Sequence, residues 1–326
     1  MWKRVELIFE LESPLHIGYL PFVGSVIAPT RYYIPGKNFW GAITQKITKY
    51  IFDEPESDNY KQIGQSIKKN FRFSYFYVYD GQNIYFPCYG EEGLYYGIEA
   101  KIKEQDFEYK YVGSRVLTAI NNNTGSAEDE TLHEVEFIHD KYIDVEENIN
   151  KTRIIGTIWI KELVNIDTSQ GKKKISIKDD GIYIDNLNIF KKLTIGGERN
   201  YGFGRIELVS ISVGEKDYTL KDETNDDQGV VIIVKNDFPI INHIVYENQL
   251  DFRGDIELLS GRQYYRNDDT KSVYRVKRRY EKPGEYIVFP EYYFAPGTTL
   301  WGSKENSRNT KEKKFILQWD GTGVYL

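Results

Sequence analysis

The segment 193–207, LTIGGERNYGFGRIE, gathers glycines, arginines and aromatic residues in one turn that leads into an alternating stretch. Glycine allows positive φ values and lets the main chain come close to a ligand. Arginine supplies guanidinium groups for phosphates, and aromatic rings offer faces on which bases stack. The segment therefore predicts a loop that binds a phosphate backbone through Gly196, Gly197, Arg199, Tyr201, Gly202, Phe203 and Arg205.

The same glycines do not fit the standard nucleotide motifs. A P-loop requires Gly-Lys-Ser/Thr after its second glycine, whereas Gly202 is followed by Phe203 and Gly204. A Rossmann fingerprint opens a helix, whereas IELVSISV at 206–213 alternates like a strand. ATP and NAD are therefore disfavoured, and no cofactor is expected. The alternative from this loop alone is a glycine-rich hairpin that binds no ligand.

The overall composition is that of an ordinary folded protein. The chain has 326 residues, of which 40% are hydrophobic, and this length corresponds to about two domains. The start alternates polar and apolar residues, unlike a signal sequence, and no uncharged apolar run is long enough to span a bilayer. We therefore expect a cytoplasmic protein with no membrane partner. With one cysteine, Cys88, and four histidines, we expect no internal disulfide and no metal site.

The net charge of −6 argues against a free-standing nucleic-acid-binding domain, which is usually strongly basic. Lysine and arginine are nevertheless clustered, in GKKK at 171–174, RVKRRYEK at 275–282 and KEKK at 311–314. Such runs are typical of solvated faces. A subunit of a larger ribonucleoprotein can also be acidic outside and basic along one groove.

Three segments have the pattern of strands. Residues 2–12 and 152–163 alternate apolar and polar side chains, and FRFSYFYVYDGQNIYFP at 71–87 reads as two strands joined by a turn at Asp80 and Gly81.

Two segments have the pattern of helices. Residues 38–52 place apolar side chains at helical spacing behind a possible cap at Asn38, and IDNLNIFKKLTI at 184–195 predicts a short helix before the glycine loop. The resulting order is strand, helix, strands, helix, strand. It predicts an α+β fold with a ferredoxin-like (RRM-like) β-α-β-β-α-β unit.

A polar stretch without periodicity at 217–228 predicts a linker. It separates a first domain, 1–216, from a second, smaller domain, 229–326, for which we also predict a ferredoxin-like fold. FAPGTTLWG at 294–302 resembles IPGKNFWGA at 34–42, as if each half began an element with the same turn.

Four separated segments carry a resemblance to a known family. They are SPLHIGYL at 13–20, YIPGKNFWGAITQKI at 33–47, RVLTAINNNTGSAEDETLHEVEFI at 115–138 and IGGERNYGFGRIEL at 195–208. In this order they resemble the motifs of the RAMP superfamily of CRISPR-associated proteins. The resemblance implies a β-hairpin thumb at about 112–138, laid across a guide–target duplex, and a glycine-rich loop at 195–205.

The resemblance also implies partners and further contacts. The partners are guide RNA, target RNA and other CRISPR effector subunits, including a large signalling subunit and backbone RAMP subunits. RNA contacts are expected from Arg31, Lys37, Asn38 and Arg115 in addition to the loop. Trp40 stands where the family has a lysine, and Lys37 and Arg31 are its expected substitutes. From Tyr19 to Ile34 there is no Asp or Glu, so we expect no cleavage of target RNA by this chain.

The function predicted from these features is a non-catalytic RNA-binding subunit of a type III effector, closest to type III-D, that caps the 5′ handle of the guide. One alternative is a backbone-type subunit of the same complex. Another is a metal-independent endonuclease that processes precursor guide RNA, with His16 as acid or base, Tyr32 or Tyr33 as helper and Lys37 as charge stabiliser. A purely structural interaction module is the third.

Overall fold

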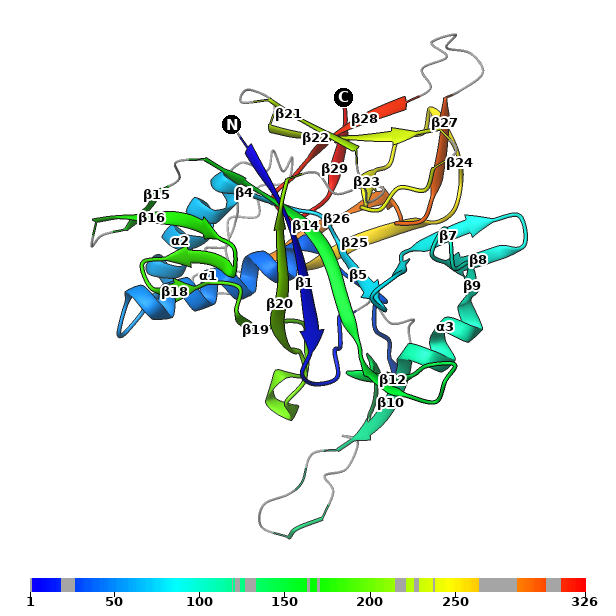
Figure 1. Cartoon of the computed structure of the whole chain (residues 1–326), viewed down its shortest axis with the longest axis horizontal. Helices are drawn as coiled ribbons and strands as arrows, with labels where there is room; N and C mark the ends of the chain where they lie inside the picture. Colours follow the sequence, from blue (N-terminus) through cyan, green and yellow to red (C-terminus); the bar gives the residue numbers. More distant parts are fainter. Residues whose placement is uncertain are drawn as a thin grey trace.

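The structure is a computed structural model, drawn as a ribbon in Figure 1. It describes residues 2–18, 27–118, 120, 124–126, 133–162, 165–168, 171–214, 221–225, 229–236, 238–263, 286–302 and 312–326. Within them the fold is α+β and mostly strand, with three α-helices. None of these helices has the length and apolar character needed to cross a membrane.

An antiparallel sheet forms the centre of the molecule (Figure 1). Its strands are β1 (Trp2–Leu11), β3 (Tyr33–Ile34), β4 (Phe71–Phe73), β5 (Phe76–Tyr79), β6 (Ile84–Tyr85), β14 (Arg153–Lys161), β19 (Lys192–Thr194) and β20 (Arg205–Val213). They are ordered β19-β20-β1-β14-β5-β3, with β4 paired to β14 and β6 to β5. The strands predicted at 2–12 and 152–163 and the hairpin turn at 80–81 are confirmed.

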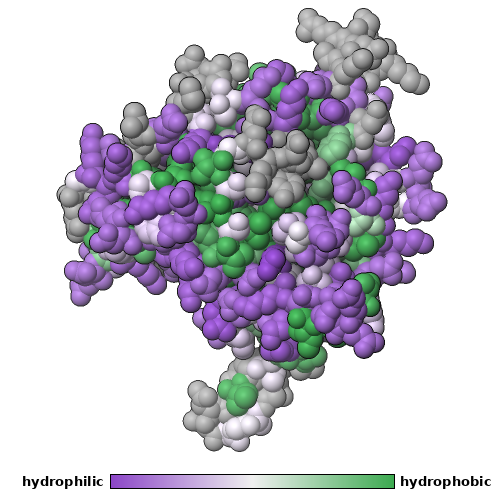
Figure 2. Space-filling view, in the orientation of Figure 1, coloured by the Kyte–Doolittle hydropathy of each residue, from purple (hydrophilic) through white to green (hydrophobic). Residues whose placement is uncertain are grey.

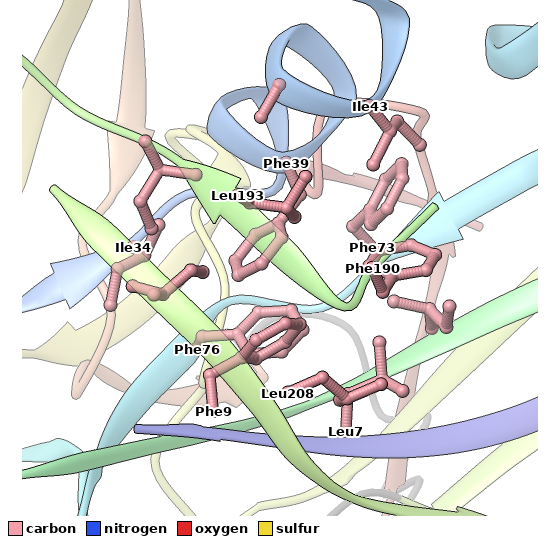
Figure 3. Packing of buried hydrophobic residues seen from close by; sticks show 14 of the residues in the cluster. Leu7, Phe9, Ile34, Phe39, Ile43, Phe73, Phe76, Phe190, Leu193 and Leu208 are labelled. Carbon is pink, nitrogen blue, oxygen red and sulfur yellow. The ribbon is translucent and has the colours of Figure 1, made fainter. Parts of the chain in front are cut away.

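Helices α1 (Gly36–Ile51) and α2 (Ser57–Asn70) contribute their apolar side chains to the core on one face of this sheet. Figure 3 shows Phe39 and Ile43 of α1 packed with Phe9 and Phe76 of the strands. The rings of Phe39 and Phe76 are 4.0 Å apart between centroids. The alternation of β1 and the helical spacing of α1 thus bury one continuous apolar core.

The start of α1 differs from the prediction. The helix begins at Gly36 and its N-cap is Pro35, two residues before the predicted region, and Asn38 is not the cap. The reason lies in the C-terminal part of the chain, because the main-chain N–H of Lys37 donates to the carbonyl oxygen of Asp320 at 3.1 Å. A neighbouring carbonyl therefore satisfies a donor that a capping side chain would otherwise satisfy.

The helix predicted at 184–195 is wrong. The segment instead completes β17 (Gly181–Ile184) and forms β18 (Leu187–Asn188) and β19. Asp185 starts the two-residue turn between β17 and β18 and has a left-handed φ of 51°. Two-residue hairpin turns require a positive φ at this position. Strands β17 and β18 form a small sheet with β15 (Asn165–Thr168) and β16 (Gly171–Lys178), and this sheet stands in place of the second helix.

The predicted thumb is an antiparallel hairpin of β10 (Val112–Leu117) and β11 (His133–Ile138), which projects from the body of the molecule (Figure 1). Strand β11 also pairs with β2 (Ile27–Ala28). Residues 119, 121–123 and 127–132 of the predicted thumb lie outside the described residues. Nearby elements are β7 (Pro87–Gly90), β8 (Gly93–Tyr96), β9 (Ile102–Lys103), α3 (Glu104–Tyr111), β12 (Lys141–Ile143) and β13 (Ile149–Lys151).

A second sheet packs against the other face of the main sheet. Its strands are β21 (Lys221–Asn225), β22 (Gly229–Lys235), β23 (Ile244–Val245), β25 (Ile256–Gln263), β26 (Tyr286–Phe294), β28 (Glu312–Leu317) and β29 (Gly323–Tyr325), in the order β21-β22-β28-β29-β23-β26-β25. A separate pair consists of β24 (Leu250–Arg253) and β27 (Thr299–Gly302). The buried cluster between the two sheets includes Trp2, Tyr75, Tyr77 and Trp159 with Val230, Ile232, Ile241 and Leu317.

This second part differs from the prediction in three ways. From residue 221 onward the described residues contain strands and no α-helix. Residues 221–225 of the predicted linker form β21, which pairs with β22. The two Pro-Gly segments do not begin the same element, because 34–42 starts helix α1 whereas 294–302 leads into strand β27.

Of the basic run at 275–282, nothing lies within the described residues.

Candidate nucleic-acid interface

The glycine loop is fastened to the turn at residues 13–18. The main-chain N–H of Gly204 donates to the carbonyl oxygen of Pro14 at 2.8 Å, and that of Gly197 donates to the carbonyl oxygen of His16 at 2.9 Å. Both ends of the loop are therefore held by one short turn. Two motifs that lie almost two hundred residues apart in the sequence become neighbours.

The same turn holds the base of the thumb. Leu15 and Ile138 exchange main-chain hydrogen bonds of 2.9 and 2.8 Å, and the Nδ1 atom of His16 lies 2.7 Å from the carbonyl oxygen of Glu136. The Glu136 carboxylate accepts a hydrogen bond from the main-chain N–H of Thr30 at 2.8 Å, just before β3. The turn, the thumb, the segment before α1 and the glycine loop therefore meet in one place.

Positive φ explains three of the loop glycines. At Gly196, with φ of 79°, a Cβ atom would lie 2.2 Å from the carbonyl oxygen of His16, and at Gly204, with φ of 81°, it would lie 1.9 Å from that of Ile195. Gly202 also has positive φ, 86°, but a Cβ atom there would meet no atom within 4 Å. Gly196 and Gly204 therefore allow close packing of the main chain, whereas Gly202 faces open space.

This difference gives a prediction for a pair of variants. Gly202→Ala is expected to lower the free energy of unfolding by about 1–2 kcal/mol, the cost of left-handed backbone for a residue with a Cβ. Gly204→Ala is expected to cost clearly more, because it adds a clash with the carbonyl oxygen of Ile195. Chemical denaturation of both variants measures the difference. Equal losses would contradict this account of the loop.

Three predicted contact residues are exposed around this loop. Arg199 begins the short 3-10 helix η1 (Arg199–Tyr201), and its Nε atom donates to the carbonyl oxygen of Gly196 at 3.0 Å. Tyr201 is 51% exposed. Arg205, at the start of β20, is exposed as well. The loop thus presents two guanidinium groups and one ring to solvent.

Phe203 and Arg115 connect the loop to the thumb. Phe203 is 1% exposed and packs edge-on against Phe137 of β11, with 5.4 Å between ring centroids. The guanidinium of Arg115, on exposed strand β10, lies 6.0 Å from the centre of the same ring. Phe203 therefore anchors the loop and does not offer its face to a base. Together with Arg199 and Arg205 of the loop, Arg115 is a third exposed cation.

The other three predicted contact residues lie elsewhere. Arg31 is buried and pairs through both of its terminal nitrogens with the carboxylate of Glu257, at 2.8 Å for Nη1. Lys37 and Asn38 lie in the first turn of α1, where the main-chain N–H of Lys37 donates to Asp320 and that of Asn38 donates to Pro35. Partial loss of water around the ammonium of Lys37 lowers its pKa, and the nearby guanidinium of Arg31 acts in the same direction.

The candidate catalytic residues are also held by protein contacts. His16 is 6% exposed, and its hydrogen bond to Glu136 fixes the turn. The hydroxyl of Tyr32 donates to Glu108 at 2.8 Å, and the ring of Tyr33 stacks on that of Tyr75 at 5.5 Å. Within the described residues, no group of three His, Cys, Asp or Glu side chains is placed to hold a metal ion.

Two groups of residues were not predicted from the sequence. One is the buried cluster of Arg31, Glu257, His243 and Tyr75 between the two sheets, whose members lie far apart in the sequence. The other is the set of lysines along the second half of α1, where Lys46 and Lys49 are three residues apart. The spacing of these two lysines on a predicted helix was the available signal.

No protein-family model matches the chain, and no curated protein sequence matches it. Among solved structures, the chain is similar to a chain in a cryo-EM structure of the type III-B Cmr-beta bound to cognate target RNA, with 11% identity, 91% of this chain and 86% of the other covered, and a TM-score of 0.45. A second structure of that assembly with target RNA and AMPPnP gives 12% identity, the same coverage and 0.46. A chain of its apo state gives 9% identity, coverage of 64% and 96%, and a TM-score of 0.35.

Proposed function

We propose that the chain is a non-catalytic guide-RNA-binding subunit of a type III CRISPR effector complex in the cytoplasm. The observation that carries the proposal is the meeting of three of the four motif segments at the turn 13–18, where Thr30 and Arg31, just before the fourth segment, are also hydrogen-bonded. Each of the three segments resembles a RAMP motif on its own, and hydrogen bonds between distant residues bring them to one surface. A resemblance in sequence order alone does not require this arrangement.

The chemistry of the surface suits a single-stranded nucleic acid. Arg115, Arg199 and Arg205 present guanidinium groups that bind phosphate oxygens through two parallel hydrogen bonds. The exposed ring of Tyr201 offers a stacking face that accepts any base. Contacts to the phosphate backbone and to the faces of bases position an RNA without depending on its sequence.

A role in holding RNA is better supported than a role in cutting it. The imidazole of His16 is buried and bonded to a main-chain carbonyl, and Lys37 lies beside Asp320, not beside His16. These two side chains are not arranged as an acid–base pair. The segment from Tyr19 to Ile34 also supplies no carboxylate for metal-assisted cleavage of target RNA.

The ferredoxin-like assignment of the first domain, 1–216, is part of this proposal. The strand order β20-β1-β14-β5, with α1 between β1 and β5 in the chain, supports it. The sheet β15–β18 takes the place of the second helix. Capping of the 5′ handle by the chain, in the manner of a type III-D subunit, is also part of this proposal.

The composition of the purified complex tests the proposed function. We expect the tagged chain to copurify with a processed guide RNA that has a constant 5′ end, and with a large polymerase-like subunit. The RNA is identified by sequencing and the subunits by mass spectrometry. Isolation of the chain as a lone metal-independent ribonuclease would overturn the proposal.

A further inference from the structure

A groove lies between the second half of α1 and the strands β19 and β20. Its volume is about 460 Å³, within the roughly 300–1,000 Å³ of typical ligand sites. Its charged lining residues are Lys46, Lys49, Lys192, Arg205, Glu12 and Glu207. Arg205 directly follows Gly204, so the groove begins where the glycine loop ends.

The two carboxylates do not cancel the positive charge of this groove. Glu207 pairs with Lys191 at 3.5 Å and with Lys192 at 3.4 Å, and Glu12 pairs with Lys151, which does not line the groove. Among the described residues, Lys46, Lys49 and Arg205 form no ion pair. Three cations therefore remain for an anion from outside.

Lys46 occupies the most enclosed position of the three. Its Nζ atom donates to the carbonyl oxygen of Lys192 at 2.9 Å and lies against β19. Burial lowers the pKa of this ammonium to about 8, because water is partly removed without a compensating negative charge. An anion that enters the groove would supply that charge and favour the protonated form.

Figure 2 shows the visible face as mostly hydrophilic around an apolar region over the central strands. The groove combines its cations with an apolar floor, which is formed by Ala42, Leu193 and Ile206. A ribose or base can rest on such a floor while its phosphate meets the lysines. An inorganic anion would use the cations alone.

We propose that this groove binds the backbone phosphates of single-stranded RNA that continues from the glycine loop past Arg205. The inference rests on the proposed function and extends it, because it gives the RNA a path along β20 and β19 toward α1. An acidic protein segment would satisfy the same charges. RNA is favoured because Arg205, one of the predicted RNA contacts at the end of the glycine loop, also lines the groove.

The test compares two double variants of the full chain. Lys46→Ala/Lys49→Ala removes the two groove lysines on α1, and Lys61→Ala/Lys69→Ala removes two exposed lysines from α2 that do not line the groove. Alanine favours helix at all four positions, and the change in net charge is the same. Lys49→Ala alone, at an exposed position, serves if the first double variant is destabilised.

The measured quantity is the affinity for oligouridine RNA at several salt concentrations. The groove variant is expected to bind about tenfold more weakly, with a slope in log salt reduced by about 1.4, since each lost contact with single-stranded phosphate accounts for about 0.7. The α2 variant is expected to bind like the wild type. Equal weakening of both double variants would overturn the proposal.

The outcomes separate this inference from the proposed function. If the wild type binds RNA and the groove variant binds equally well, the groove proposal fails and the proposed function stands. If an acidic protein is lost from the complex while RNA affinity is unchanged, the groove is a protein site and the proposal fails. If the wild type binds no RNA at any salt concentration, both fail.

Discussion

Replacement of Glu257 by alanine is expected to lower the free energy of unfolding by about 3–5 kcal/mol, the usual cost of removing one partner from a buried ion pair. Glu257, on β25, lies between the two sheets. Its carboxylate accepts hydrogen bonds from Arg31 at 2.8 Å and from the Nε2 atom of His243 at 2.7 Å. His243 is fully buried, and its Nδ1 atom lies 2.8 Å from the hydroxyl of Tyr75.

Without this carboxylate, the buried guanidinium of Arg31 would lose the two hydrogen bonds that Glu257 accepts from its terminal nitrogens. A matched control is Glu223→Ala, which removes an exposed ion pair with Lys314 and is expected to cost less than about 1 kcal/mol. Denaturation by guanidinium chloride measures both variants. A loss of equal size would show that the buried cluster does not join the sheets.

The same cluster predicts a dependence on pH. Burial alone would raise the pKa of Glu257, but the hydrogen bonds and charges of Arg31 and His243 outweigh it and lower this pKa from 4.5 to about 2. The contribution of Glu257 to stability is therefore present above pH 4.5 and lost as the pH falls toward 2. The difference in unfolding free energy between wild type and Glu257→Ala should shrink over this range.

The elements that position the site were predictable where their signals are local. The alternation of β1 and the helical spacing of α1 predict both elements correctly, because each buries one apolar face against the same core. The segment 184–195 was mispredicted because a short apolar run fits a helix and a hairpin equally well. The turn at Asp185, which closes the hairpin, decided between them.

The candidate site itself was only partly predictable. Arg199, Tyr201 and Arg205 lie exposed where the motif placed them. Arg31 does not, because its partner Glu257 is 226 residues away and nothing near Arg31 in the sequence indicates it. Phe203 looked like a stacking ring, but the thumb that covers it is also distant in the sequence. Packing between remote segments was the missing information.

Arg199→Ala is expected to weaken RNA binding by about 1.5–3 kcal/mol, the range for a charge-assisted hydrogen bond to phosphate. This corresponds to roughly a 10- to 150-fold rise in Kd. The fold should be kept, because Arg199 is exposed and, among the described residues, its side chain donates a hydrogen bond only within the loop, to the carbonyl oxygen of Gly196. Arg253→Ala, at an exposed position in the C-terminal part, removes the same charge away from the loop and serves as the control.

The measurement that tests the central claim most directly is the affinity for guide RNA as a function of salt concentration, for the wild type, Arg199→Ala and Arg253→Ala. If the glycine loop holds guide phosphates, Arg199→Ala binds more weakly and its slope in log salt is smaller by about 0.7, the loss of one contact with single-stranded phosphate, while Arg253→Ala matches the wild type. If all three proteins have the same affinity and the same slope, the loop is a structural hairpin and does not bind RNA.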